Sequence, residues 1–410
     1  MLVLTGSLKH YDWGSRDALP RLTGRAPAER PEAELWFGAH VDGPARVQAA
    51  LDAEPTFAAA DLASAIASDP PRWLGAAVAR RFGARLPFLV KLLAAERPLS
   101  LQAHPSAAQA AAGFAREEAA AVPRTARERC YRDASHKPEL VIALGPFDAL
   151  AGFRAVTETA SWLAQLGSGG APSLVELRAP LAASADGAGL RAALTWAFGL
   201  DEGRRRQVVE ELGAAARRVP AGAPLARAAR WIALLAGRHP GDPGVVGAAL
   251  LEQRALGPGS ALFLPAGSLH AYLAGLAVEV MASSDNVLRG GLTTKHIDVP
   301  ELLGVLDFDA PAPPLLSPSP AVGPGALPGE VEWRTSAAEF QVSRLALRGE
   351  LEHSASGPEL WVPVAGELTL TSPGGAASRV APGEGAFVAP GHRLRATGSA
   401  TVFRARVPDA

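Results

Sequence analysis

The chain has 410 residues, of which 48% are hydrophobic and 20% charged, and its formal net charge at pH 7 is −1. A charge this small gives no surface-wide field that would recruit nucleic acid or an anionic membrane, and no signal peptide or membrane-spanning run is visible. Cys130 is the only cysteine, which excludes an intrachain disulfide and a thiolate-rich zinc site. We therefore expect two or three compact units in a cytoplasmic, monomeric protein that contacts neither nucleic acid nor membrane.

Ala-rich segments with Arg or Glu at helical spacing predict helices at 56–68, 106–120, 156–166, 188–198, 204–217 and 223–237. Most of them lie between the strand-like segments "ELVIALGPFDALAGF" and "SALFLPAGSLHAYL". The glycine-rich segment 167–173 is predicted to be a surface loop. Strands that stop for a helical block and then resume predict a β unit that carries a helical insertion.

The predicted fold is therefore mainly β with an α-helical insertion. A first β unit comprises residues 1–153 and 241–308, and the helical insert comprises residues 154–240. Residues 309–330 are too rich in proline for a helix or a central strand and form a linker or a packed connector. Alternating segments separated by turn residues then predict a small barrel or jelly roll at 331–410.

Scarce polar residue types concentrate in five short stretches, which are the functional candidates: 9–14, 86–106, 131–139, 268–272 and 279–296. Arginine has replaced lysine almost everywhere, and the four lysines that remain are Lys9, Lys91, Lys137 and Lys295. Because a lysine is a compact point charge and arginine a planar fork, these lysines mark places where the exchange fails. Lys91 interrupts the apolar strand "LPFLVKLL", so it either snorkels from an edge or reaches into a pocket for an anion, and its rarity favours the pocket.

A metal site is predicted from three motifs. Gly259 to His270 follows the G-x₅-P-x-G-x₂-H pattern of the cupin jelly roll, which alone suits a buried structural histidine equally well. Gln102 and His104 are two residues apart in an extended segment, so their side chains share a face. Glu139 begins an apolar strand, where an inward carboxylate is costly unless it is paired or metal-bound. Two imidazoles, a carboxylate and an amide oxygen form a ligand set suited to Zn²⁺.

These stretches resemble the type I mannose-6-phosphate isomerases of the cupin superfamily. The resemblance is carried by "YDWGS", "ELWFGAH", "LPFLVKLLAAERPLSLQAHPS", "YRDASHKPELVIAL" and "HAYLAGLAVEVMASSDNVLRGGLTTKHIDVPELL". It implies a cupin catalytic domain with a helical insert and a second, metal-free cupin-like domain. It also implies one Zn²⁺ per chain, bound by Gln102, His104, Glu139 and His270, and interconversion of mannose 6-phosphate and fructose 6-phosphate through a cis-enediol(ate).

The same resemblance implies roles for ten further residues. Arg289 lies beside the reacting carbons, and the acid/base candidates are His136, Lys137, Glu279 and Asp285. Pocket-lining or phosphate-contacting positions are Trp13, Lys91, Ser100, Tyr272 and Lys295. The phosphosugar's phosphate is expected at Ser100, Lys91 and Lys295, and the identity of the general base stays open.

Departures from the family pattern at Ser135, Gly290–Gly291 and Thr294 remove no ligand or charge. Two other functions remain compatible with the residues. Two histidines and a carboxylate also suit a non-haem iron oxygenase, and a phosphosugar pocket without turnover would suit a regulatory binding protein.

Overall fold

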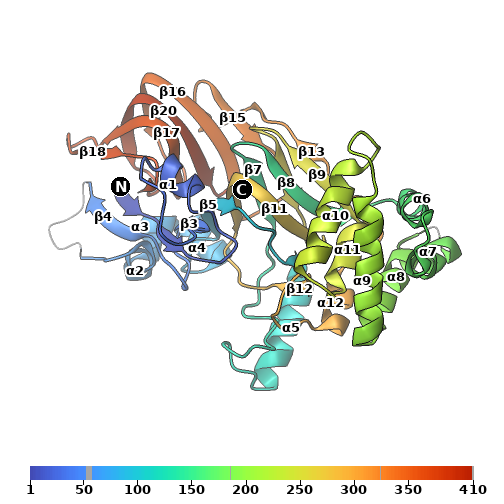
Figure 1. Cartoon of the computed structure of the whole chain (residues 1–410). Helices are drawn as coiled ribbons and strands as arrows, with labels where there is room; N and C mark the ends of the chain where they lie inside the picture. Colours follow the sequence, from blue (N-terminus) through green and yellow to red (C-terminus); the bar gives the residue numbers. More distant parts are fainter. Residues whose placement is uncertain (52–57, 185, 324, 409–410) are drawn as a thin grey trace.

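Two β-sheets and a block of helices make up the protein in a computed structural model, which describes residues 1–51, 58–184, 186–323 and 325–408 (Figure 1). The mainly β fold with a helical insertion is therefore confirmed. Within the described ranges, every helix is too short or too polar to span a lipid bilayer.

The first sheet has eleven strands and carries the candidate site. Its strands are β2 (Ser7–Lys9), β3 (Glu34–Phe37), β5 (Phe88–Ala95), β6 (Leu101–Ala103), β7 (Glu139–Ala143), β8 (Phe147–Phe153), β9 (Leu251–Leu256), β10 (Ala261–Leu264), β11 (His270–Ala282), β12 (Leu288–Gly291) and β13 (Leu315–Leu316). As the cupin pattern predicts, β11 begins at His270, after a turn in which Gly267 has a φ of 78°.

The strand β11 is the centre of this sheet because it pairs with four others. Its first half pairs with β6 and β8, and its second half pairs with β5 and β7. The two halves meet at Gly275, where φ is 131° and a Cβ would lie 2.6 Å from the Phe147 ring. Only glycine fits this backbone without strain. The bend lets one strand serve both parts of a sheet that curls around a cavity.

Period-two alternation decides which side chains enter that cavity. On β5, Lys91 and its alternate neighbours line the cavity, whereas Val90 and Leu92 pack on the outer face. On β7, Glu139 shares the inner face with Val141, and Leu140 lies outside. An apolar cluster that includes Val141 and Phe147 fills the inner end of the barrel. The polar residues are therefore confined to the open end.

The second sheet has nine strands and includes two from the N-terminal region. They are β1 (Leu2–Thr5), β4 (Arg46–Ala50), β14 (Ser319–Pro320), β15 (Glu330–Trp333), β16 (Gln341–Ser354), β17 (Glu359–Thr371), β18 (Ala377–Val380), β19 (Glu384–Val388) and β20 (Arg393–Arg406). Because β1 pairs with β19, the chain's first strand lies in the sheet formed mostly by residues 331–410. The predicted domain limits stay a proposal. The pairing of β1 with β19 joins a strand of the predicted first β unit to the predicted C-terminal unit.

The proline-rich segment 309–330 is a packed connector. Its short strand β13 pairs with β10 of the first sheet, and β14 pairs with β15 of the second. The outer faces of the two sheets also share one apolar core, to which Leu92 and Val280 contribute from the first sheet and Leu360 and Phe403 from the second. The two β units are therefore held together by buried apolar surface.

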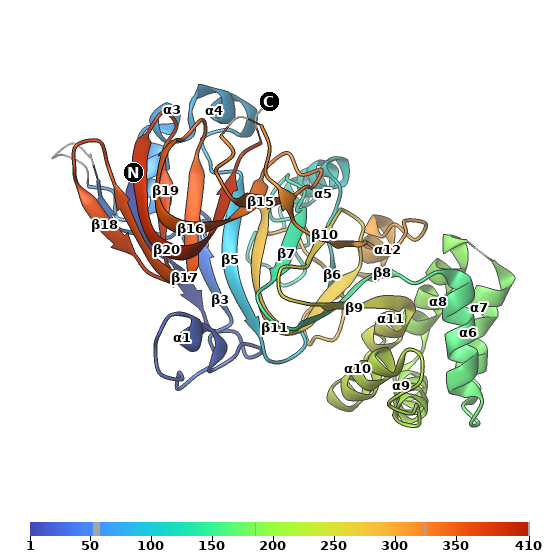
Figure 2. The same ribbon diagram turned by 90° about the horizontal axis from the view of Figure 1, so that it is seen from above.

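Helices α6–α11 gather at the end of the molecule far from β16 and β20 (Figures 1 and 2). The helices are α1 (Ala18–Leu22), α2 (Leu62–Ser68), α3 (Pro70–Leu74), α4 (Ala76–Phe82), α5 (Ala107–Ala119), α6 (Val156–Gly167), α7 (Pro172–Ala183), α8 (Gly187–Gly199), α9 (Glu202–Arg217), α10 (Ala226–Arg238), α11 (Gly244–Leu250) and α12 (Val299–Val305).

One predicted helix and one predicted loop need correction. Residues 56–57 of the helix predicted at 56–68 lie outside the described ranges, and α2 begins only at Leu62, after the capping residue Asp61. The predicted surface loop at 167–173 is too long, because Gly167 still belongs to α6 and α7 begins at Pro172. Ser173 is fully buried in the helical core. Pro172 occupies the first turn of α7, where a proline can start a helix without losing a hydrogen bond.

A buried ionic cluster lies inside the second sheet. The Arg404 guanidinium is 1% exposed and donates to Glu359 at 2.6 and 2.9 Å and to Glu330 at 3.2 Å. His353 and the Trp361 indole also contact Glu359. Burial alone would raise the pKa of Glu359, but these hydrogen bonds outweigh it and lower the pKa to about 2. The second β unit thus contains its own fixed cation.

We expect Arg404→Met to destabilise the protein by about 3–5 kcal/mol, because it leaves two buried carboxylates without a cation. Urea unfolding followed by circular dichroism measures the change. The control is Arg379→Met, which removes an exposed pair with Glu367 and should cost less than about 1 kcal/mol. Equal effects of the two substitutions would contradict the importance of the buried cluster.

Candidate metal centre and pocket

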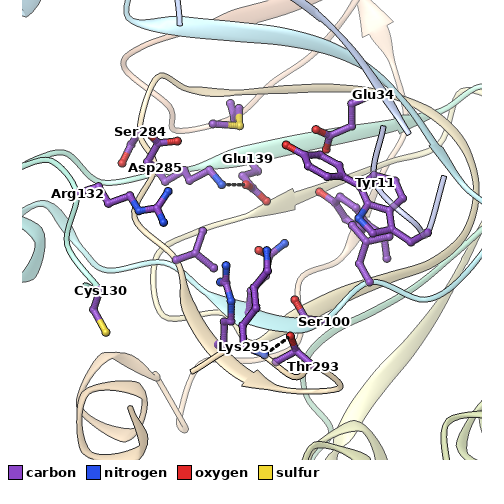
Figure 3. Close-up of a pocket in the computed structure, with 18 of the residues that line it drawn as sticks. Tyr11, Glu34, Ser100, Cys130, Arg132, Glu139, Ser284, Asp285, Thr293 and Lys295 are labelled. Atoms are coloured by element: carbon purple, nitrogen blue, oxygen red, sulfur yellow. Dashed lines mark hydrogen bonds and ion pairs between the residues drawn. The ribbon is translucent and has the colours of Figure 1, made fainter. Parts of the chain in front are cut away.

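A cavity of about 850 Å³ opens at the polar end of the first sheet. All of the predicted site residues line it except His104, His136 and His270. Figure 3 shows Cys130 and Arg132 on one side, Tyr11 and Glu34 on the other, and Glu139 between them. Side chains from segments far apart in the sequence therefore meet in one cavity.

Three predicted metal ligands converge at its floor. His104 Nε2 lies 3.2 Å from Glu139 Oε1, and His270 Nε2 lies 3.3 Å from Glu139 Oε2. Each of the three residues is 1% exposed. Gln102 lines the cavity beside them, because its strand pairs with β11 and places Gln102 opposite His270. The four ligands predicted from the sequence are thus neighbours.

The orientation of both imidazoles suits metal binding. His104 Nδ1 lies 2.7 Å from the backbone oxygen of Asn286, and His270 Nδ1 lies 2.9 Å from that of Ser268. A carbonyl accepts only from N–H, so Nδ1 carries the proton and Nε2 presents a lone pair to the floor. His104 Nε2, His270 Nε2 and Glu139 Oε2 are buried and have no hydrogen-bond partner among the described residues. Buried polar atoms normally have partners, so these three atoms fit the ligand set of a cation.

The spacing and charge of this group fit Zn²⁺. Metal–ligand bonds of about 2.0–2.2 Å in a tetrahedron put neighbouring ligand atoms about 3.4 Å apart, close to the separations observed. Burial lowers the pKa of His104 to about 4, which keeps the imidazole neutral. Burial alone would raise the pKa of Glu139, but Lys137 and His104 outweigh it and hold the pKa well below its usual value. Neutral imidazoles and an ionised carboxylate are the forms that bind metal.

Lys137 lies directly beside the ligand group. Its Nζ is 3.0 Å from Glu139 Oε1, and the side chain is buried and lines the cavity. Lys137 is therefore a direct neighbour of the predicted metal ligand Glu139.

One wall of the cavity is built around a lysine held by two carboxylates. Lys91 Nζ lies 2.8 Å from Glu279 Oε2 and 3.7 Å from Glu34 Oε1. The Tyr272 hydroxyl donates to Glu279 at 2.8 Å, and the Trp36 indole donates to Glu34 at 2.8 Å. Lys91 is buried in the cavity wall as expected, but its charge is already compensated. The expectation that it contacts the phosphate needs revision, because a dianion there would face two carboxylates.

The opposite wall carries cations without carboxylate partners. Arg132, Arg289 and Lys295 line it, and no ion pair joins any of them to an acid in the described ranges. Burial first, and then the neighbouring Arg132, lower the pKa of Arg289. Burial and the two arginines likewise lower the pKa of Lys295. Cations held together against their mutual repulsion form a site for an anion.

The rim of the cavity contains the remaining candidates. Asp285 is engaged by His40 Nε2 at 3.2 Å and by Arg124 Nη2 at 2.6 Å. Burial alone would raise the pKa of Asp285, but these partners outweigh it and lower the pKa to about 2. Trp13 stacks on Tyr11 with ring centroids 5.6 Å apart. Ser100 also lines the cavity.

His136 does not line the cavity, although it was expected to act on the substrate. Its Nε2 lies 2.7 Å from Oε1 of Glu339, which precedes β16 of the second sheet. Because neighbouring residues of an extended chain point to opposite sides, His136 faces the second β unit while Lys137 faces the metal site. We therefore remove His136 from the acid/base candidates.

Two residues of the site, Glu34 and Arg132, were not singled out from the sequence, whereas Asn286 was noted as the sole asparagine of the candidate stretch 279–296. Glu34 and Arg132 line opposite walls, and both lie in segments that carried the family resemblance. Asn286, the sole asparagine, is fully buried, and its side chain accepts from the backbone of Arg132 at 2.7 Å and donates to Ser135 O at 2.9 Å. Together with its backbone contact to His104, Asn286 ties the loop before Glu139 to a metal ligand. Its rarity was the available signal.

The curled sheet with inward histidine, glutamate and glutamine side chains defines a metal-binding cupin protein. Residues 1–156 match the family described as "Phosphomannose isomerase type I, catalytic domain". The chain is 39% identical over 398 residues to a mannose-6-phosphate isomerase of Escherichia coli, covering 95% of each chain. The chain belongs to the type I phosphomannose isomerase family.

Solved structures agree with this assignment. The fold matches a variant of phosphomannose isomerase from Salmonella typhimurium with a TM-score of 0.86 at 34% identity, and the match covers 100% of both chains. It matches a mannose 6-phosphate isomerase bound with zinc and yttrium with a TM-score of 0.85 at 34% identity, again over 100% of both chains. The likeness therefore extends over both β units and the helical block.

We expect His104→Ala and Glu139→Ala each to lower the zinc content of the purified protein from about one ion per chain to below about 0.2. The reason is that the site loses metal affinity when any one of its ligands is removed. Atomic emission spectroscopy measures the content. His10→Ala removes an exposed histidine and should keep the metal. Full zinc occupancy in both ligand variants would disprove this site.

Proposed function

We propose that this protein is a zinc-dependent aldose–ketose isomerase that interconverts mannose 6-phosphate and fructose 6-phosphate. The observation that carries this proposal is the convergence of His104, Glu139 and His270 at the floor of a cavity with an unpaired cationic wall. Family membership supports the reaction. The zinc-bound relative supports the cofactor.

Gln102, His104, Glu139 and His270 would hold Zn²⁺, which when bound would supply a Lewis acid for a sugar oxygen. Arg289 lies next to this group, because β12 pairs with β6 and puts Arg289 opposite Gln102. Its guanidinium is therefore placed to stabilise the negative charge that develops on the cis-enediolate. A preorganised cation in a partly buried site is worth more than one in water.

Proton transfer between C1 and C2 requires a group at the cavity floor. Lys137 and Glu279 are the two predicted acid/base residues that line the inner cavity close to the ligand group. Asp285 is tied to His40 and Arg124 at the rim instead. We assign proton transfer to Lys137 or Glu279, with Tyr272 and Lys91 holding the Glu279 carboxylate in place.

The phosphate end of the substrate is assigned to Arg132 and Lys295 on the cationic wall, whereas Arg289 on the same wall faces the reacting end. Charge-assisted hydrogen bonds from Arg132 and Lys295 would hold a dianion. Ser100 stays a possible hydroxyl donor on the lining. Lys91 is assigned to the acidic wall, where carboxylates accept from sugar hydroxyls. Binding energy gained at the phosphate then orients the reacting carbons.

The two other functions are not favoured. An iron oxygenase would use the same two histidines and carboxylate, but it gives no role to three unpaired cations in the cavity. A regulator without turnover gives no role to Arg289 beside the ligand group. A monomeric state and a cytoplasmic location stay part of the proposal, supported by a single cysteine that is buried and unpaired.

A coupled assay should show conversion of mannose 6-phosphate to fructose 6-phosphate, with loss of activity on chelation and recovery on adding zinc. Arg289→Met should lower kcat about 10²–10³-fold at unchanged zinc content, because it removes charge stabilisation in the transition state. Oxygen uptake without isomerisation would favour the oxygenase. Wild-type kcat in the Arg289 variant would exclude Arg289 from the reaction.

Arg132→Met should raise KM for mannose 6-phosphate about 10–100-fold with little change in kcat, because a charge-assisted hydrogen bond to phosphate is lost. Lys91→Met should instead lower kcat, since it releases Glu279. Arg206→Met on the exposed face of α9 is the charge-matched control. If KM rose for Lys91→Met but not for Arg132→Met, the phosphate would instead be assigned to the wall of Glu34, Lys91 and Glu279.

A further inference from the structure

The ion pair between His136 and Glu339 joins the second β unit to the loop that carries the metal site. The two residues are 203 positions apart, and the Nε2–Oε1 distance is 2.7 Å. The His136 side chain is 33% exposed and the Glu339 side chain 12% exposed. The contact therefore lies at the edge of the apolar core shared by the two sheets.

Glu339 is rigidly held on its own side. Its neighbours Ala337 and Phe340 are buried in the core between the sheets. The Glu339 side chain is 12% exposed, and its second oxygen, Oε2, is buried without a hydrogen-bond partner among the described residues. The hydrogen bond to Glu339 raises the pKa of His136, which strengthens the pair. Glu339 is thus a fixed point.

The loop on the other side leads directly into the site. Ser135 O accepts from the Asn286 side chain at 2.9 Å, and Pro138 O accepts from the Ala282 backbone at 3.1 Å. Between these two anchors lie only His136 and Lys137, which point to opposite sides. When His136 is held outward by Glu339, the backbone between the anchors holds Lys137 inward, 3.0 Å from Glu139.

We propose that Glu339 is a positioning residue for the isomerisation, which it supports by holding His136 outside the cavity so that Lys137 stays directed at the metal site. This rests on the proposed function. The second β unit then takes part in catalysis through one side chain. A partly exposed ion pair that served only to join the units would contribute little to stability and nothing to kcat.

The test compares Glu339→Ala, Glu339→Gln, His136→Ala and the double variant Glu339→Ala/His136→Ala. We expect both alanine variants to lose about tenfold in kcat, with KM, zinc content and Tm close to wild type. The double variant should lose no more than either single one, because all three break the same link. Glu339→Gln should keep most of the activity, since its amide oxygen still accepts from the imidazole. Glu367→Ala, an exposed acid of the same sheet, is the control.

A second measurement does not depend on activity. With only four lysines in the chain, acetylation by acetic anhydride can be followed at each one by mass spectrometry. Lys137 is buried, and we expect it to react several-fold faster in Glu339→Ala, while the rate at Lys9 stays unchanged.

Two results would overturn the positioning role. One is wild-type kcat and Lys137 labelling in Glu339→Ala, which would leave only an interface contact. The other is a loss in His136→Ala far above that in Glu339→Ala, which would mean that His136 acts on the substrate itself. If the wild-type protein lacked isomerase activity but Lys137 was still labelled faster in Glu339→Ala, the positioning of Lys137 by Glu339 would stand and the proposed function would be rejected.

Discussion

A carboxylate buried between two imidazoles is the constraint on which the rest of the site depends. Glu139 enters the barrel on the inner face of β7, and its Oε2 has no hydrogen-bond partner among the described residues. An ionised group in that position is too costly unless cations compensate it. Lys137 supplies one, and the two Nε2 lone pairs and the Gln102 amide complete a set that suits a second. The backbone carbonyls behind both histidines keep those lone pairs directed inward.

The cavity above this floor has walls of opposite character. On one wall, Lys91 is shared by two carboxylates, so this surface is suited to sugar hydroxyls. On the other, Arg132, Arg289 and Lys295 are left to repel one another. A phosphosugar is a molecule with hydroxyls at one end and a dianion at the other. The distribution of charge in the cavity therefore suits the proposed substrate and the proposed direction of binding.

Both β units contain buried carboxylates, and the charge of these carboxylates is compensated in different ways. In the second unit, Glu330, Glu359 and His353 surround the guanidinium of Arg404, so their charge is balanced by the chain itself. In the first unit the corresponding requirement is left to a metal ion. This difference gives a physical reason for the expectation of a metal-free C-terminal unit. Its contribution to the reaction would then come through Glu339 at the interface.

Local patterns in the sequence determined the mainly β fold and the helical insertion, and they selected the four residues proposed as metal ligands. Alternation along β7 placed Glu139 inside, and the spacing of Gln102 and His104 placed both on one face, because these are properties of a few consecutive residues. Only the tertiary structure decided that His136 turns toward Glu339, that Lys91 forms an ion pair with Glu279, and that the first strand joins the C-terminal sheet. The first two contacts join residues 203 and 188 positions apart. No local pattern encodes such partners, since they are set by how the two sheets pack on their shared apolar core.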